Sequence, residues 1–449
     1  MARIFPFRAY RYDASRFDLS RVLTQPYDKI TPQMQERYYA LDPHNLVRIE
    51  KGRSEPGDSA GSGVYARGAQ TMDDWVREGV LRPDASPSLY VCSQEFVVPG
   101  TDTRRTRRGL TALLGLEDYS AGVVFRHERT HSAARTDRLE VLRHTRAHTG
   151  RLMMLFDDAG GGVTGQLDRV TRTVPENELK DEFGVTHRLW PVSDPAAIDS
   201  FVRALAPQKL LIADGHHRYE TALNYRDECR ARGAGSSPDA PHEKTLVTLL
   251  ALQDPGVVVL PTHRTVRATP DAPVDFDSLR KSVEGIFDWY AYPFPAESER
   301  GAALAEFRHD FAATAKVDSR RRAIGVYAGN AAFYLFVLRP QVDLESALAG
   351  VPPAQRLLDV VLLHRLLLER SLGLTADAVE REKNIGYHRD PMEAVAAVDS
   401  GAAKIAFLLN PIPARQVYEL ALAGNVLPQK STDFYPKLLS GLAIYRLDG

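Results

Sequence analysis

The string ADGHHR places a carboxylate, two imidazoles and a guanidinium side by side. Asp214 can accept a proton or bind Mg²⁺, and His216 can transfer a proton. His217 and Arg218 add hydrogen-bond donors that suit phosphate, and Gly215 completes a turn signal with Asp214. This set predicts a phosphate site in which Asp214 is the base or metal ligand and His216 is catalytic. The alternative is a helix-capping aspartate with exposed basic neighbours.

The flanking residues predict the elements that position this string. Residues 210–212 are a short apolar run typical of a buried strand, and residues 219–225 are compatible with a helix. The polar string therefore lies where a strand ends and a helix begins, which is where open α/β sheets bind ligands. The free N–H groups and the positive dipole end of a helix N-terminus also favour an anion.

Other polar strings supply residues that we expect to contact a substrate. These residues are Tyr27, Asp28, Asn45, Arg48, His127, Thr130, Asp137, Arg138, His263 and Arg264. Asn45 and Arg48 suit the backbone of an amino-acid substrate, and the alternative is a turn followed by a salt-bridging arginine. His263 and Arg264 follow a predicted strand and suit an anion, and the alternative is a pair of solvated loop residues.

Glu128 is a second candidate for the general base. It follows His127 after an apolar stretch, but no histidine completes the HExxH spacing of a zinc protease. Helix caps and surface ion pairs are the alternative for this region.

Lys430, Ser431 and Thr432 place one ammonium group and two hydroxyl groups in a row. Such a set can bind phosphate or a carboxylate, so we expect these residues to bind phosphate. The glycines of a P-loop are missing there, and no GxGxxG follows a strand elsewhere. The alternative is a proline-flanked surface loop.

The composition excludes several classes of protein. The chain has 449 residues, a net charge of −1 and two cysteines, Cys92 and Cys229. Near-neutral charge argues against general nucleic-acid binding, and two isolated cysteines indicate a reducing cytoplasm. No apolar run approaches the length of a membrane span. A basic cluster at residues 104–108 is expected to be the solvated tip of a hairpin.

The order of predicted elements indicates a mixed α/β (α+β) fold in two regions. Residues 1–267 form an N-terminal α/β region that contains DGHHR. Residues 268–449 form a C-terminal α+β region that contributes the string KSTDFYPK. Within it, residues 323–338 predict a hairpin, and residues 353–370 predict the clearest helix of the chain.

Seven strings together resemble a large bacterial family of proteins with a domain of unknown function. The matching strings are QPYD at 25–28, NLVR at 45–48, HE-x-T at 127–130, DR at 137–138, ADGHHRYETAL at 213–223, PTHR at 261–264 and KSTDFYPK at 430–437. One departure is visible, because Ala134 and Arg135 stand where the family has a Pro-Lys pair. The positive charge is kept and the proline is lost.

The DGHHR string also resembles the phosphate-binding motif of the ParB/sulfiredoxin-like superfamily, which includes free-serine kinases. This local resemblance implies a nucleotide-binding core in which Gly215, His216, His217 and Arg218 hold phosphates. It further implies that a nearby carboxylate acts as base or Mg²⁺ ligand. The motif contains no cysteine, which argues against sulfiredoxin chemistry.

The leading hypothesis is a phosphotransferase that moves a phosphoryl group from ATP, ADP or pyrophosphate to a small hydroxyl compound. Free L-serine is the first acceptor to consider, and Mg²⁺ is expected as a phosphate-bridged cofactor. The oligomeric state is left open, a homodimer included. The rival hypothesis is a non-catalytic or NTP-hydrolysing ParB-like regulatory protein. A metal-dependent hydrolase built on His127, Glu128, His216 and His217 ranks below both, because no pair has the usual helical ligand spacing.

Overall fold

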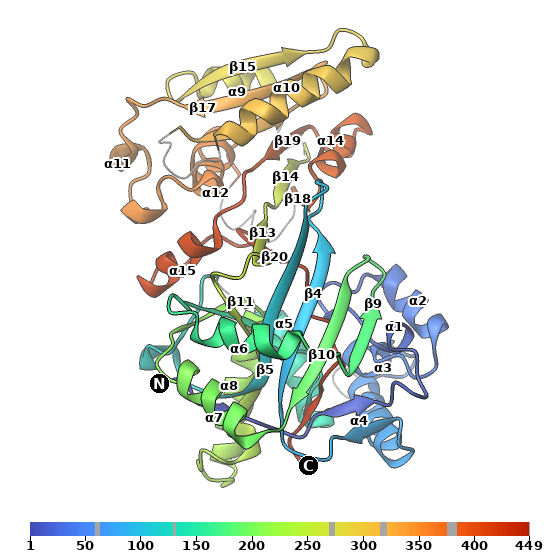
Figure 1. Ribbon diagram of the computed structural model, residues 1–449. Coiled ribbons are helices and arrows are strands. Elements are labelled where there is room, and N and C mark those ends of the chain that lie inside the picture. The colour runs from blue at the N-terminus through green and yellow to red at the C-terminus, as the bar shows by residue number, and fades with distance from the viewer. Residues whose placement is uncertain (59–62, 129–131, 269–273, 315–320, 375–383, 449) are drawn as a thin grey trace. The chain divides into compact units, whose positions relative to one another are not determined.

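The computed structural model describes residues 1–58, 63–128, 132–268, 274–314, 321–374 and 384–448. The chain has a mixed α/β fold and divides into two compact units (Figure 1). Unit 1 comprises Met1–Val258 and Phe434–Gly449, and unit 2 comprises Val259–Asp433. The string KSTDFYPK is therefore shared, with its first four residues in unit 2 and its last four in unit 1. None of the described helices has the length and apolar character needed to cross a membrane.

Unit 1 is built on a large mixed sheet. The strand order is β6 (Val124–Phe125), β11 (Leu210–Asp214), β8 (Leu152–Phe156), β12 (Lys244–Ala251), β5 (Arg104–Gly115), β4 (Leu89–Val97), β10 (Thr186–Val192) and β9 (Asn177–Lys180), with β1 (Ile4–Phe5) beside β5. Two neighbouring pairs, β6 with β11 and β8 with β12, are parallel, and the other pairs are antiparallel. The mixed sheet expected from the sequence is confirmed.

Helices cover both faces of this sheet because its strands bury side chains on both sides. Leu89 and Val91 of β4 point to one face, while Tyr90 and Cys92 point to the other. The first face packs against α6 (Gly162–Thr171), α7 (Pro195–Leu205) and α8 (His216–Ala231). The second face packs against α1 (Leu19–Val22), α3 (Val47–Glu50) and α4 (Gly63–Arg77). Helix α2 (Pro32–Leu41) adjoins α1 and α3, and α5 (Ser132–Thr145) packs on α4 and α8.

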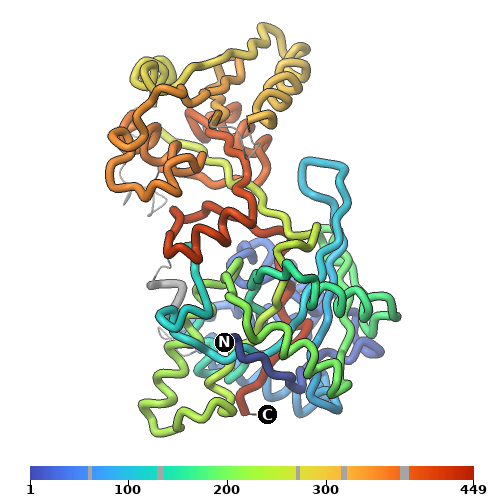
Figure 2. The backbone as a smooth tube through the Cα atoms, turned by 60° about the vertical axis from the view of Figure 1, so that its left-hand side comes forward, coloured from blue at the N-terminus to red at the C-terminus, as the bar shows by residue number. Residues whose placement is uncertain are grey.

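The end of the chain is part of unit 1. Residues 439–445 contribute apolar side chains to the core on the second face, and Figure 2 shows this last segment running among earlier parts of the unit. Short ladders complete the unit: β2 (Tyr10–Tyr12) pairs with β3 (Leu81–Pro83), and β7 (Ala147–His148) pairs with β21 (Tyr445–Arg446). The chain crosses between the units within β13 (Val258–Leu260) and at β20 (Asp433–Tyr435).

Unit 2 contains an antiparallel sheet. Its strand order is β15 (Phe287–Pro293), β17 (Ala332–Leu338), β16 (Ala323–Tyr327), β19 (Ile405–Leu408), β14 (His263–Val266) and β18 (Ile385–His388). Helices α10 (Arg300–Ala313) and α14 (Pro391–Asp399) pack their apolar residues on it. Further helices in the described part of unit 2 are α9 (Phe276–Ser282), α11 (Leu344–Ala347), α12 (Asp359–Leu362) and α15 (Ala414–Leu422). The hairpin predicted at residues 323–338 is confirmed as β16 and β17.

The continuous helix predicted for residues 353–370 is wrong in its first half. Pro353–Gln355 is a separate 3₁₀ turn, and α12 begins only at Asp359. A π-helical segment, Leu363–Glu369, follows α12 directly. The apolar pattern marked a buried segment correctly, but such a pattern does not determine where a helix begins.

Candidate functional site

The strand and helix predicted around DGHHR are confirmed. Strand β11 ends at Asp214 and α8 begins at His216, with Gly215 between them as the N-cap. Gly215 has a φ of +97°, and a Cβ atom there would lie 2.7 Å from Cδ2 of Leu152. Glycine is required on both grounds, and it leaves the first N–H groups of α8 without a side-chain cap.

Asp214 is held between two cations of unit 1. Lys437 donates from Nζ to Oδ1 at 2.7 Å, and Arg218 donates from Nη2 to Oδ2 at 2.7 Å. Burial by itself would raise the pKa of Asp214, but Lys437 and Arg218 outweigh it and lower the pKa below its ordinary value. Asp214 is therefore ionised at neutral pH. This state suits an anchor for cations or a metal ligand better than a general base.

Two further arginine side chains are buried near this strand–helix junction. Arg151 and Arg107 are almost completely buried, and neither forms an ion pair within the described chain. Burial lowers the pKa of both side chains, that of Arg107 to about 10. Arg218 donates from Nη1 to the carbonyl of Arg151 at 2.7 Å. The Nε atoms of Arg151 and Arg218 are buried and have no hydrogen-bond partner among the described residues, which favours an anion as the missing acceptor.

His127 and His216 form a buried pair. Their rings meet edge to face with centroids 4.7 Å apart, and Nδ1 of His127 lies 2.9 Å from the carbonyl of Ile212. Burial lowers the pKa of His127 to about 4 and that of His216 well below its ordinary value. Both rings are neutral at pH 7, so they contribute hydrogen bonds and shape to the site instead of positive charge. His217 is half-buried in the first turn of α8.

Glu128 lies next to this histidine pair. Its Oε1 is 3.9 Å from Nε2 of His127, and its side chain is 21% exposed. Thr130, which was expected to contact a substrate, lies outside the described residues.

A cavity of about 440 Å³ opens in unit 1 between α3, α4 and α5. Its lining residues are Tyr27, Gln35, Ile49, Glu50, Lys51, Gly52, Ser54, Val64, Tyr65, Gly68, Asp137, Arg138, Val141 and Thr145. Three of the residues predicted to contact a substrate are among them. The guanidinium of Arg138 lies 4.1 Å from the ring centre of Tyr27, and Asp137 accepts a hydrogen bond from Tyr65 at 2.9 Å. The cavity therefore offers acidic, basic and aromatic groups to a small polar molecule.

A smaller cavity of about 40 Å³ is lined both by residues of the larger cavity and by Arg218 of the DGHHR junction. It shares Glu50 and Arg138 with the larger cavity and is also lined by Gly150 and Arg218. A Cβ atom at Gly150 would lie 3.1 Å from Arg218 Nη1 and Ser440 Oγ, and 3.6 Å from Glu50 Oε1. These side chains thus converge on one point. Glu50 is buried there and accepts hydrogen bonds from Thr149 and Ser440.

The other predicted residues of unit 1 bond within the chain or face solvent. Asn45 is fully buried and uses its amide group to bond the carbonyl of Arg21 and the N–H of Val47. Arg48 donates to two backbone carbonyls of the same region. Asp28 is exposed.

The remaining predicted residues lie in unit 2. Arg264 is buried and donates from Nη2 to the carbonyl of Lys430 at 2.9 Å, which joins the strings PTHR and KST. Lys430 is exposed, whereas Ser431 is buried and Thr432 is half-buried. His263 accepts the N–H of Leu409 at 3.1 Å, and burial lowers its pKa to about 3.

Sequence reasoning missed three residues of the site: Lys437, Glu50 and Arg151. Lys437 closes the same string that contains Lys430, so attention to that whole string could have found it. Glu50 follows NLVR by two positions. Arg151 has no comparable signal in the sequence.

The residues fit a metal ion held mainly by a ligand's phosphates. Across the described ranges, no three or more His, Cys, Asp or Glu side chains are arranged to bind a metal. A phosphate-bridged Mg²⁺ needs only one or two protein carboxylates, and Asp214 stands at the helix start where phosphates would bind.

The fold and the site together define a mixed α/β protein with an anion-suited strand–helix junction. Residues 4–361 match the family model described as "Protein of unknown function (DUF1015)". The chain belongs to this family. No protein with a curated description matches it.

Solved structures show a distant similarity. A conserved hypothetical protein from Pyrococcus furiosus matches 73% of this chain and 93% of its own, with 12% identity and a TM-score of 0.32. A free serine kinase in complex with AMP matches 71% and 89%, with 12% identity and a TM-score of 0.32. SbnI from Staphylococcus aureus, truncated at its C-terminus, matches 74% and 87%, with 9% identity and a TM-score of 0.33.

Proposed function

We propose that this protein is a phosphotransferase that transfers a phosphoryl group to the hydroxyl of a small molecule bound in unit 1. One observation carries the proposal. The buried Nε donors of Arg151 and Arg218 lack partners in the described chain, close to the uncapped start of α8. Buried donors are almost always satisfied in proteins, so an anion that accepts from them is the expected ligand.

Lys437 and Arg218 neutralise the transferring phosphate in this proposal. Phosphoryl transfer needs mainly charge neutralisation and in-line positioning, and both cations are already held in place by Asp214. The free N–H groups of α8 supply further donors. ATP, ADP and pyrophosphate all present the terminal phosphate that such a site would bind. Mg²⁺ bound to these phosphates would take Asp214 as its protein ligand and add positive charge.

The acceptor occupies the larger cavity and places its hydroxyl beside Glu50, which lines both cavities. Glu50 is the carboxylate at that position, so we assign it as the general base that receives the hydroxyl proton. Glu128 is the second candidate for this role. Asp137 and Arg138 offer opposite charges to the acceptor, which suits an amino acid, and free L-serine is the first to test.

Phosphorus NMR of the purified protein tests this function. ATP, ADP and pyrophosphate are each incubated with Mg²⁺ and L-serine, and then with a pool of other amino acids and sugars. A new phosphoester signal that is lost in Lys437→Met and Glu50→Gln, but kept in the exposed control Lys404→Met, would support the proposal. Hydrolysis of the donor alone would favour the regulatory alternative. Absence of any reaction with every donor would reject the phosphotransferase.

A further inference from the structure

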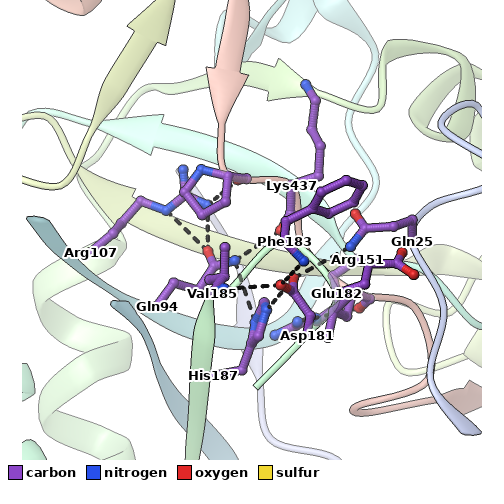
Figure 3. Close-up of polar contacts among 12 residues, drawn as sticks. Gln25, Gln94, Arg107, Arg151, Asp181, Glu182, Phe183, Val185, His187 and Lys437 are labelled. Carbon is purple, nitrogen blue, oxygen red and sulfur yellow. Dashed lines mark hydrogen bonds and ion pairs between the residues drawn. The ribbon is translucent and has the colours of Figure 1, made fainter. Parts of the chain in front are cut away.

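The backbone carbonyls of Tyr435, Pro436 and Lys437 all accept hydrogen bonds from buried side chains. Arg107 donates from Nη1 to the carbonyl of Tyr435 at 3.0 Å and from Nη2 to the carbonyl of Pro436. Gln94 donates from Nε2 to the carbonyl of Lys437 at 2.8 Å. With these carbonyls turned toward β4 and β5, the side chain of Lys437 leaves the cluster, as Figure 3 shows, and reaches Asp214.

The same hydrogen-bonded chain continues away from Lys437. Gln94 accepts from Arg107 through its Oε1, and its Nε2 lies 3.5 Å from Nδ1 of His187. His187 in turn places Nε2 3.0 Å from Oδ2 of Asp181 (Figure 3). A carboxylate fixes the proton of His187 on Nε2, so Nδ1 is free to accept from Gln94. This tautomer orients the amide of Gln94 with its nitrogen toward the backbone carbonyl of Lys437.

Asp181 is the rigid end of this chain. Its Oδ1 accepts the N–H groups of Phe183 and Val185 at 2.9 and 3.0 Å within the turn between β9 and β10. Its Oδ2 accepts from Gln25 at 3.4 Å in addition to His187. The carboxylate is thus anchored by the backbone of its own turn, and it can hold the ring of His187 in one orientation.

Burial makes these contacts directional and strong. Gln94, Arg107 and His187 are each less than 5% exposed. Hydrogen bonds in such surroundings are not in competition with water, and an unsatisfied group is expensive. Among the described residues, the acceptors of Arg107 are all neutral, although a guanidinium at this depth would be better compensated by a carboxylate. Its donors match the spacing of the carbonyls at 435 and 436.

We propose that Gln94, Arg107 and His187 are positioning residues for Lys437. They fix the backbone at residues 435–437, so that the ammonium group of Lys437 is placed beside Asp214 before any ligand binds. Their importance for catalysis rests on the proposed phosphotransferase function. The placement of Lys437 does not depend on that function and can be measured separately.

The first test measures how fast Lys437 reacts with an amine-acylating reagent at pH 8, read by mass spectrometry in the full-length protein. The exposed Lys404 serves as the internal reference. Gln94→Glu keeps the acceptor for Arg107 but loses the donor to the carbonyl of Lys437, so it should raise the labelling rate of Lys437 roughly fivefold. His187→Leu should act in the same direction, because it releases the amide of Gln94.

His187→Gln is the matched control. Its amide can donate to Asp181 and accept from Gln94, so the labelling rate of Lys437 should return to that of the unmodified protein. A role in stability alone would not produce this selective change at one lysine while the rate at Lys404 stays constant. Labelling of Lys437 at the original rate in both folded variants, Gln94→Glu and His187→Leu, would overturn the proposal.

Pyrophosphate binding, measured by calorimetry without turnover, connects the two proposals. The affinity should fall roughly fivefold in Gln94→Glu and in His187→Leu, and it should stay at the wild-type value in His187→Gln. If labelling changes as expected while phosphorus NMR finds no transfer with any donor, the positioning role stands and the phosphotransferase fails. If transfer occurs and labelling is unchanged, the positioning role fails alone.

Discussion

Lys437 Nζ lies 2.7 Å from Oδ1 of Asp214, although 223 residues separate the two along the chain. The segment that carries Lys437 belongs to unit 1 but follows the whole of unit 2 in the sequence. The carboxylate at the end of β11 thereby obtains a second cation that its own strand–turn–helix segment does not supply. The site is complete only when the end of the chain has folded onto unit 1.

Removing the ammonium group should destabilise unit 1. Lys437→Met keeps most of the length of the side chain but leaves Arg218 as the one cation of the described chain in direct contact with Asp214. Loss of one partner of a buried ion pair usually costs about 3–5 kcal/mol, and because Arg218 still pairs with Asp214 we expect the low end, about 3 kcal/mol, as the loss in the free energy of unfolding. Urea unfolding followed by circular dichroism measures this value.

The double variant Lys437→Met with Asp214→Asn supplies the control for that measurement. Because the two groups interact, the combined loss should be smaller than the sum of the two single losses. Additive losses would mean that the 2.7 Å contact contributes little to stability in solution.

Gly215→Ala should be more harmful than the same change at Gly233. Both glycines have positive φ, +97° and +85°, but only Gly215 is crowded, with Leu152 2.7 Å from the added Cβ. The left-handed conformation alone costs about 1–2 kcal/mol for alanine. Gly233→Ala should show about that loss in the free energy of unfolding, and Gly215→Ala should exceed it. Equal losses would show that Leu152 moves aside without cost.

The local structure around DGHHR was predictable because its signals are local. The apolar run at residues 210–212, the turn at Asp214–Gly215 and the helix-compatible residues after it need no distant partner to be interpreted. The hairpin β16–β17 was predictable for the same reason.

The role of Arg107 could not be predicted in this way. An arginine-rich stretch is typical of a solvated loop, but β5 already begins at Arg104, and the pleat turns Arg107 inward. Its acceptors at Tyr435 and Pro436 lie more than 300 residues further along the chain. Burial of a cation that depends on such distant carbonyls leaves no mark in the surrounding sequence. The expectation of a solvated tip is therefore wrong for Arg107.

The free energy of unfolding should decrease as the pH is lowered, because His127 titrates. Burial lowers its pKa from 6.5 to about 4, so the folded protein binds fewer protons than the unfolded chain between these values. The contribution of neutral His127 is complete above pH 6.5 and is lost as the pH falls toward 4. The slope is at most about 1.4 kcal/mol per pH unit.

His127→Asn isolates this effect. The asparagine amide can still donate to the carbonyl of Ile212 but does not titrate. The dependence of the free energy of unfolding on pH, measured between pH 7 and 4.5, should become shallower in this variant. The matching change at the exposed His309, His309→Asn, should leave the slope unchanged. A slope unaffected by His127→Asn would show that another group titrates.

Gly150→Ala should impair transfer more than folding. The added methyl group would lie 3.1 Å from Arg218 Nη1 and Ser440 Oγ and 3.6 Å from Glu50 Oε1, so it enters the point where these side chains converge. Flexible side-chain ends can shift by a few tenths of an ångström, which keeps the effect on stability small. Displacement of a positioned base or phosphate ligand by such amounts lowers kcat, by about tenfold. Gly165→Ala is the control and should keep full activity, because an added Cβ there has no neighbour within 4 Å and Gly165 lines neither cavity. Equal activity of the two variants would show that Gly150 does not adjoin the reacting groups.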